Sequence, residues 1–173
     1  STLNIDDLIN LHMIEKIMNG NIPYKEINII ITPLFHYIGA LFMKVLGLSF
    51  RSFYLFGALT SAIICVLGYH IIMTQTKNTK IGYLWTAVFF WLFSQIQCAN
   101  YNIMLLVFPM LIIILEEYRY RCKIDTRKGK MINLFVGIIL SFCVLTKHTV
   151  GSIFLLLYFI YLIYIKKQES KPS

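Results

Sequence analysis

Long apolar stretches, separated by short polar ones, fill most of the chain from residue 33 to residue 165. They cover residues 33–46, 52–73, 81–97, 102–117 and 131–165. A helix needs about 20 mostly apolar residues to cross a hydrocarbon core of about 30 Å. The whole chain is 58% hydrophobic and only 14% charged, whereas soluble domains carry about 25% charged residues. We therefore predict an all-α, multi-pass helical membrane protein.

The first and the last of these stretches do not have the length of one span. Residues 33–46 would form a helix of about 21 Å, so we expect it to lie in the membrane interface. Pro33 suits the first turn of that helix and Gly47 its end. Residues 131–165 would reach about 52 Å as one helix, and the polar residues at 146–149 divide them. We predict spans at 52–73, 81–97, 102–117, 131–146 and 150–165.

The positions of the basic residues orient these spans. Lys and Arg gather in the loops 74–80 and 118–130 and in the tail 166–173. Cytoplasmic loops carry such an excess, which predicts that residues 1–50 form an extracytoplasmic loop with juxtamembrane helices.

The net charge of +8 is confined to these short stretches, so nucleic-acid binding is not expected. The four cysteines show no CxxC spacing, which gives no indication of zinc or disulfides. The chain begins with Ser and ends in a polar tail, so we expect it to be part of a longer membrane protein.

Asp6 and Asp7 are the first candidates for chemistry. As an ordinary helix start, they would cap the first turn and offset the helix dipole. As a catalytic pair, two adjacent carboxylates near a low-dielectric surface would disfavour double ionisation, and one would serve as a general base. The sequence leaves both interpretations open.

Lys147 and His148 interrupt the last apolar stretch. A lysine inside a membrane is costly and is usually functional or reaches the headgroups. In a functional role, this turn would bind a phosphate. Arg51 either anchors its span at the interface or contacts a phosphate.

Two further groups of charged residues stand at helical spacing. His12 and Glu15 have a spacing that can hold a metal together with an Asp, but one such pair is weak support. Glu116 and Glu117 precede Arg119 and Arg121, so we expect surface ion pairs there.

The order of motifs in residues 6–51 resembles the first extracytoplasmic loop of polyprenyl-phosphate-sugar glycosyltransferases of the GT-C superfamily. The motifs are Asp6-Asp7, Gly20, Ile22-Pro23-Tyr24-Lys25-Glu26, Thr32-Pro33-Leu34-Phe35-His36-Tyr37, Leu46-Gly47-Leu48-Ser49 and Arg51. The resemblance is to the protein O-mannosyltransferase and aminoarabinose-transferase-like members. Leu145-Thr146-Lys147-His148-Thr149 is similar to a later motif of the bacterial members, which have Gln more often at the position of His148. Aminoarabinose-transferase-like members also place Glu-Lys where this chain has Ile30-Ile31.

This resemblance implies a GT-C-like bundle fragment with interfacial helices in the first loop. It implies a sugar donor on a polyprenyl phosphate, and an acceptor protein, glycolipid or wall polymer. Asp6 would be the catalytic residue, and Asp7, Tyr24, Glu26, Arg51, Lys147 and His148 would assist it or bind substrate. No cofactor is expected, although a divalent metal stays open. The location would be a bacterial plasma membrane, with residues 1–50 facing outward.

A non-enzymatic function is the main alternative. The chain would then be part of a lipid-carrier transporter or flippase, or a scaffold subunit of an assembly complex for envelope polymers. Transport pathways place ionisable residues near the bilayer midplane, whereas the spans at 52–117 are nearly free of charge in their interiors. A ligase that moves whole glycans from a lipid carrier shares most features of the proposed transferase.

Overall fold

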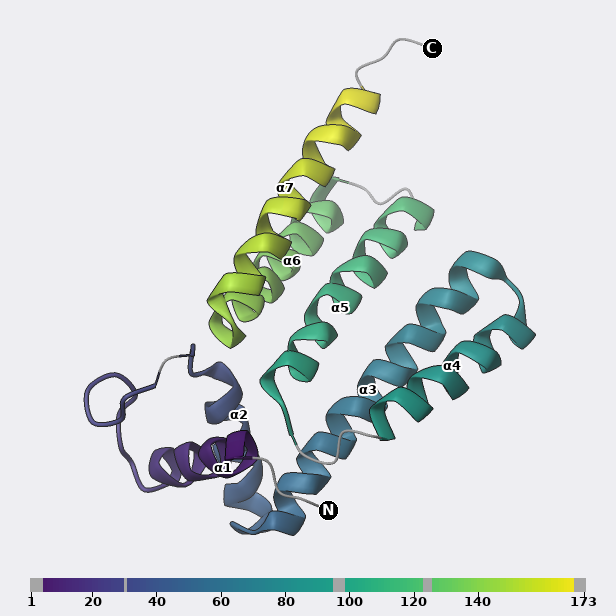
Figure 1. Cartoon of the computed structure of the whole chain (residues 1–173). Coiled ribbons are helices and arrows are strands. Elements are labelled where there is room, and N and C mark those ends of the chain that lie inside the picture. The colour runs from purple at the N-terminus through teal and green to yellow at the C-terminus, as the bar shows by residue number, and fades with distance from the viewer. Residues whose placement is uncertain (1–4, 30, 95–98, 123–125, 170–173) are drawn as a thin grey trace.

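The computed structural model describes residues 5–29, 31–94, 99–122 and 126–169, and these form seven α-helices and no strand (Figure 1). The helices are α1 (Ile5–Met18), α2 (Leu34–Leu46), α3 (Phe50–Thr76), α4 (Thr79–Ser94), α5 (Tyr101–Cys122), α6 (Thr126–Thr146) and α7 (His148–Glu169). The all-α class predicted from the sequence is confirmed. The end of the predicted span 81–97, Ile30, the loop residues 123–125 and the end of the tail at 170–173 lie outside the described residues.

Three of the described helices are long and apolar enough to cross a membrane. They cover Phe50–Thr76, Tyr101–Arg121 and Lys128–Thr146. The apolar part of α7, His148–Tyr164, is shorter, and α4 has 16 residues. The chain is therefore a helical membrane protein, and the prediction that α4 and α7 also span depends on the sequence pattern.

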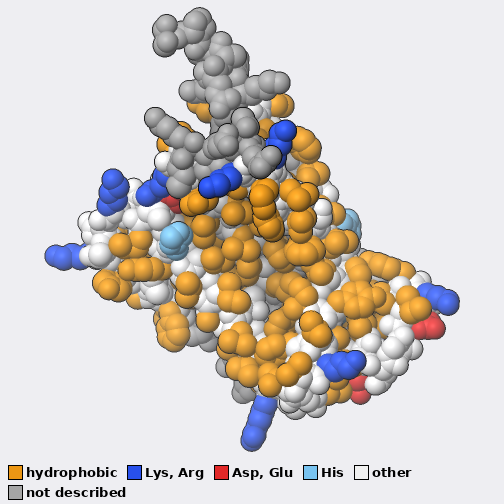
Figure 2. All heavy atoms as spheres, turned by 180° about the vertical axis from the view of Figure 1, so that it is seen from behind, with side chains coloured by type: hydrophobic (Ala, Val, Ile, Leu, Met, Phe, Trp, Pro, Cys, Tyr) orange, Lys and Arg blue, Asp and Glu red, His pale blue; other side chains and the backbone are white. Residues whose placement is uncertain are grey.

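The surface of the bundle is what a lipid environment requires. Apolar side chains cover its middle, and Lys and Arg lie toward its edges (Figure 2). Many large apolar residues on the long helices are exposed, among them Val66, Leu134 and Ile163. A soluble protein rarely exposes so extensive an apolar surface.

Helices α1 and α2 lie together at one end of the bundle (Figure 1). Helix α2 packs against α1, α3 and α6, and the main core runs through this end. Its buried members include Ile14 of α1, Phe35 and Met43 of α2, Phe53 of α3 and Cys143 of α6. Helices α1 and α2 are thus an integral part of the fold.

Local sequence signals explain where α2 and α3 begin and end. Pro33 immediately precedes α2, and Gly47 ends it with a φ of +86° while its N–H donates to the Met43 carbonyl. Glycine adopts such positive φ values without steric cost. Ser49 then caps α3 by accepting a hydrogen bond from the Ser52 N–H, which satisfies one of the unpaired donors of the first turn.

Candidate functional site at the α1–α2 end of the bundle

Lys147 lies at the break between α6 and α7, and its side chain contacts α5. Its ammonium group donates a hydrogen bond of 2.8 Å to the Asn102 side-chain oxygen and lies 5.2 Å from the centre of the Tyr101 ring. Both partners belong to the first turn of α5. A lysine has three N–H donors, so this arrangement orients the cation and leaves donors for a ligand.

The backbone around Lys147 adds to the positive character of this position. Helix α7 begins at His148, directly after Lys147, and the Lys147 side chain reaches the first turn of α5, where Asn100 caps the Asn102 N–H. The first N–H groups of a helix have no partner within it and attract anions. This arrangement suits a phosphate or another anion better than a cation.

The polypeptide that leads into α2 is bound to the same region. The Thr32 hydroxyl donates to the Val144 carbonyl near the end of α6, at 3.2 Å. At that position the α6 carbonyls lack partners within the helix. The Phe35 ring also meets the Tyr101 ring edge to face, with centroids 6.2 Å apart. The segment at the start of α2 and the Lys147 turn therefore form one assembly.

Asp6 and Asp7 occupy the first turn of α1. Asp6 is exposed, while Asp7 is half-buried and precedes the buried Asn10 and Ile14 by three and seven residues, a spacing that puts all three on one helical face. Neither carboxylate has a hydrogen bond or ion pair within the described part of the chain. Both the capping role and the catalytic role are compatible with this placement.

His36 holds α1 against α2 from inside this assembly. Its side chain is 1% exposed, and its Nε2 lies 3.2 Å from the Asn10 side-chain oxygen. Its Nδ1 is buried and has no partner among the described residues. Burial lowers the pKa of His36 to about 4, so the imidazole is neutral at physiological pH and donates its Nε2 proton to Asn10.

Tyr24 and Glu26 belong to a loop that is closed by its own hydrogen bonds. The Glu26 carboxylate accepts from the Ile22 N–H at 2.8 Å. The Tyr24 hydroxyl donates to the Ile31 carbonyl at 3.2 Å, and its backbone has a φ of +66°. Both side chains are exposed. The structure thus gives each a structural role in the loop, and their predicted contact with substrate stays a prediction.

Arg51 and His148 are exposed at the same end of the bundle. Arg51 lies in the first turn of α3 and His148 is the first residue of α7. Neither forms a hydrogen bond or ion pair with another described residue. Both side chains are available to a ligand, and the structure does not orient them as it orients Lys147.

His12 and Glu15, the pair with metal-ligand spacing, do not form part of a metal site among the described residues. His12 Nδ1 lies 3.5 Å from the Glu15 carboxylate on the surface of α1. Among the described residues, no three His, Cys, Asp or Glu side chains converge to hold an ion.

Several site residues were not predicted from the sequence. Asn102, Tyr101, Asn10 and His36 are polar or aromatic residues in helices, and nothing in their local pattern marks them as partners of distant residues. The sequence also predicted surface ion pairs at Glu116 and Glu117. The pairs exist, but the Glu116 and Glu117 side chains are only 9% and 10% exposed, so the expectation of a surface location was wrong.

Comparison with protein-family models, curated proteins and solved structures found no match for this chain.

Proposed function

We propose that this chain is the N-terminal portion of a membrane glycosyltransferase that takes its sugar from a polyprenyl-phosphate carrier. The sugar would pass, with inversion, to an acceptor hydroxyl outside the cytoplasm of a bacterium. The main support is the Lys147 turn, where an oriented ammonium group lies at the start of α7 and near Thr32 and Phe35, which belong to the same N-terminal segment as Asp6 and Asp7. The order of motifs in that loop, which resembles GT-C enzymes, supplies the reaction class.

The donor phosphate would bind at the Lys147 turn while its lipid tail stays in the membrane. Lys147 keeps N–H donors beyond the one used by Asn102. When the bond between the anomeric carbon and the phosphate oxygen breaks, charge grows on the leaving polyprenyl phosphate. Preoriented cations and dipoles stabilise such charge without reorganising. Arg51 and His148 would add contacts to the phosphate.

Asp6 would act as the general base on the acceptor. Its carboxylate takes the hydroxyl proton as the oxygen attacks the anomeric carbon from the face opposite the phosphate. Asp7, Tyr24 and Glu26 would position the acceptor, which would be a protein, a glycolipid or a wall polymer. The proposal requires no nucleotide or other cofactor, and the assay below tests a divalent metal.

The decisive experiment measures sugar release from the lipid carrier. Membranes containing the full-length protein receive a panel of radiolabelled polyprenyl-phosphate sugars, with and without EDTA, and loss of label from the lipid is followed. Asp6→Asn should lower the rate at least about 100-fold, because a general base contributes about 10²–10⁴-fold. Lys147→Met should lower the rate by a similar factor, since one preorganised donor is worth about 10²–10³-fold. Asp7→Asn, measured in parallel, separates the two carboxylates.

Lys44→Met is the matched control, because Lys44 is exposed near the end of α2 and lies at the same end of the bundle. It should release sugar at the wild-type rate. Equal rates for wild type and Asp6→Asn would remove Asp6 from the mechanism and leave it as a helix cap. If no donor in the panel loses label, while the labelled lipid crosses protein-containing vesicles, the transporter alternative would replace the transferase.

A further inference from the structure

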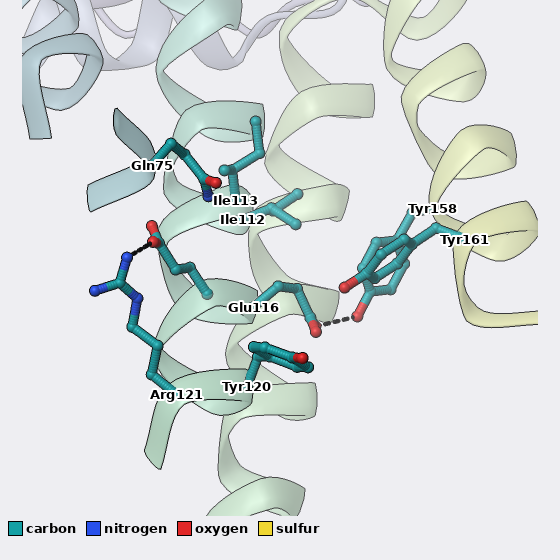
Figure 3. A pocket seen from close by; sticks show the side chains of 9 residues that line it. Gln75, Ile112, Ile113, Glu116, Tyr120, Arg121, Tyr158 and Tyr161 are labelled. Carbon is teal, nitrogen blue, oxygen red and sulfur yellow. Dashed lines mark hydrogen bonds and ion pairs between the residues drawn. The ribbon is translucent and has the colours of Figure 1, made fainter. Parts of the chain in front are cut away.

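A cavity of about 490 Å³ lies at the opposite end of the bundle from the Lys147 turn. Its walls come from the end of α3, the end of α5 and the middle of α7, and they are largely apolar, with Ile112 and Ile113 among the lining residues (Figure 3). This is the end where the predicted cytoplasmic loops leave the helices. The proposed transferase reaction does not use it.

A buried carboxylate lies in the wall of this cavity. Glu116 of α5 is 8% exposed, and one of its oxygens accepts a hydrogen bond of 2.7 Å from the Tyr158 hydroxyl of α7. The same oxygen lies 3.6 Å from the Arg119 guanidinium. The second oxygen has no hydrogen-bond partner among the described residues, so it remains available to a donor.

Three tyrosine side chains line the same cavity as this carboxylate. Tyr158 and Tyr161 lie side by side on α7 with ring centroids 5.9 Å apart, and Tyr120 of α5 also lines the cavity (Figure 3). Aromatic rings attract cations to their faces, and a group of rings with a carboxylate is a suitable cage for an ammonium ion. The hydroxyl of Tyr161 has no hydrogen-bond partner in the described chain.

A guanidinium group lies at the other side of the cavity. Arg121 forms a 2.6 Å ion pair with Glu117 and also donates to the Thr74 carbonyl at the end of α3. One amino group of Arg121 makes both contacts, and a guanidinium carries five N–H donors. Its other donors can therefore bind a phosphate. The cavity thus offers a carboxylate with aromatic rings at one side, and at the other a guanidinium that is paired with Glu117 and keeps unused N–H donors.

We propose that this cavity binds an aminophospholipid, a membrane lipid whose headgroup joins a phosphate to a primary ammonium group. The ammonium lies among the three tyrosines and donates to the free Glu116 oxygen. The phosphate accepts from Arg121, and an acyl chain covers Ile112 and Ile113. The ammonium would face the unused Glu116 oxygen, and the phosphate would face Arg121, whose charge is partly offset by its ion pair with Glu117. An anionic lipid without the ammonium would leave the second Glu116 oxygen without a donor.

The test compares three dioleoyl lipids that differ only in their headgroups. The full-length protein is purified in detergent and titrated with phosphatidylethanolamine, phosphatidylcholine and phosphatidylglycerol, and bound lipid is counted by native mass spectrometry. Phosphatidylethanolamine should bind at least tenfold more tightly than the other two, because phosphatidylcholine has no ammonium N–H and phosphatidylglycerol has no cation.

Two variants then locate the site. Glu116→Gln removes the charge, and Tyr161→Leu removes one ring without breaking a hydrogen bond between described residues. Each should lose at least tenfold in phosphatidylethanolamine affinity. Tyr118→Leu is the control, because Tyr118 lies on α5, is 56% exposed and does not line the cavity.

The proposal is overturned if phosphatidylglycerol binds as tightly as phosphatidylethanolamine, which would indicate a site for anionic lipids. It is also overturned if Tyr161→Leu binds phosphatidylethanolamine like the wild type. Should Glu116→Gln fail to fold, the Tyr161→Leu comparison decides alone.

Discussion

Gly151 is the position where one added methyl group should disturb the fold most. A Cβ atom there would lie 2.5 Å from the Cys143 carbonyl carbon and from the Val144 N and Cα atoms of α6. Real Cβ atoms do not approach backbone that closely, and a helix backbone cannot move aside as a side-chain end can. Small residues allow such close helix contacts in membrane proteins. Gly151→Ala must therefore push α7 away from α6.

Inserting a methyl group into a well-packed contact costs about 1–3 kcal/mol, and contact with backbone puts Gly151→Ala near the upper value. For a domain of this size, each kcal/mol lowers the melting temperature by about 2–4 °C, so we expect a decrease of about 6–12 °C. The Gly151 N–H donates to the Lys147 carbonyl at 2.8 Å, so sugar release should fall as well.

Gly137→Ala provides the matched control on α6. A Cβ there has open space around it, and alanine favours a helix over glycine by about 1 kcal/mol. Its melting temperature, measured by intrinsic fluorescence in detergent, should equal or exceed that of the wild type. If Gly151→Ala melts at the wild-type temperature, the close approach of α6 and α7 is wrong, and so is the position it gives to Lys147.

Three further substitutions test separate contacts. The pKa of His36 is about 4 in the fold and about 6.5 in the unfolded chain. The unfolded state therefore binds more protons below pH 6.5. The free energy of unfolding should fall by up to about 3 kcal/mol as the pH falls from 6.5 to 4. His36→Phe should lose this part of the pH dependence in melting curves, and an unchanged curve would contradict the buried neutral imidazole. Tyr158→Phe should lower stability by about 1.5–3 kcal/mol, because it removes a hydrogen bond to a charged group. A double-mutant cycle with Glu116→Leu, which removes the acceptor, should recover most of that energy as coupling. Ser49→Ala should cost about 1 kcal/mol through loss of the α3 cap, measured by the same melting curves, and a cost near zero would mean that solvent or Ser52 replaces the cap.

The helical architecture was predictable because it depends on local features of the sequence. The apolar stretches have helix-compatible lengths. Helix α2 was predicted over 33–46 and covers Leu34–Leu46, with Pro33 as its N-cap and Gly47 as its C-cap. The break at Lys147 was also predicted, since a continuous helix over 131–165 would greatly exceed the membrane thickness. What these features could not give is which face of each helix meets which neighbour. The partners of Lys147 and Glu116 lie 45 and 42 residues away in the sequence.

Glu116 and Glu117 show that residue spacing within a helix can predict an ion pair correctly without predicting how deeply the pair is buried. Their spacing from Arg119 and Arg121 predicts ion pairs within one helix, and both pairs form. Each carboxylate, however, also accepts a hydrogen bond from another helix, Glu116 from α7 and Glu117 from Thr74 of α3. These contacts join α5 to its neighbours at the end of the bundle opposite Lys147. Glu116 and Arg121 therefore have two roles in the proposed lipid site. They hold α5 against its neighbours, and they provide the charges that a zwitterionic headgroup would bind.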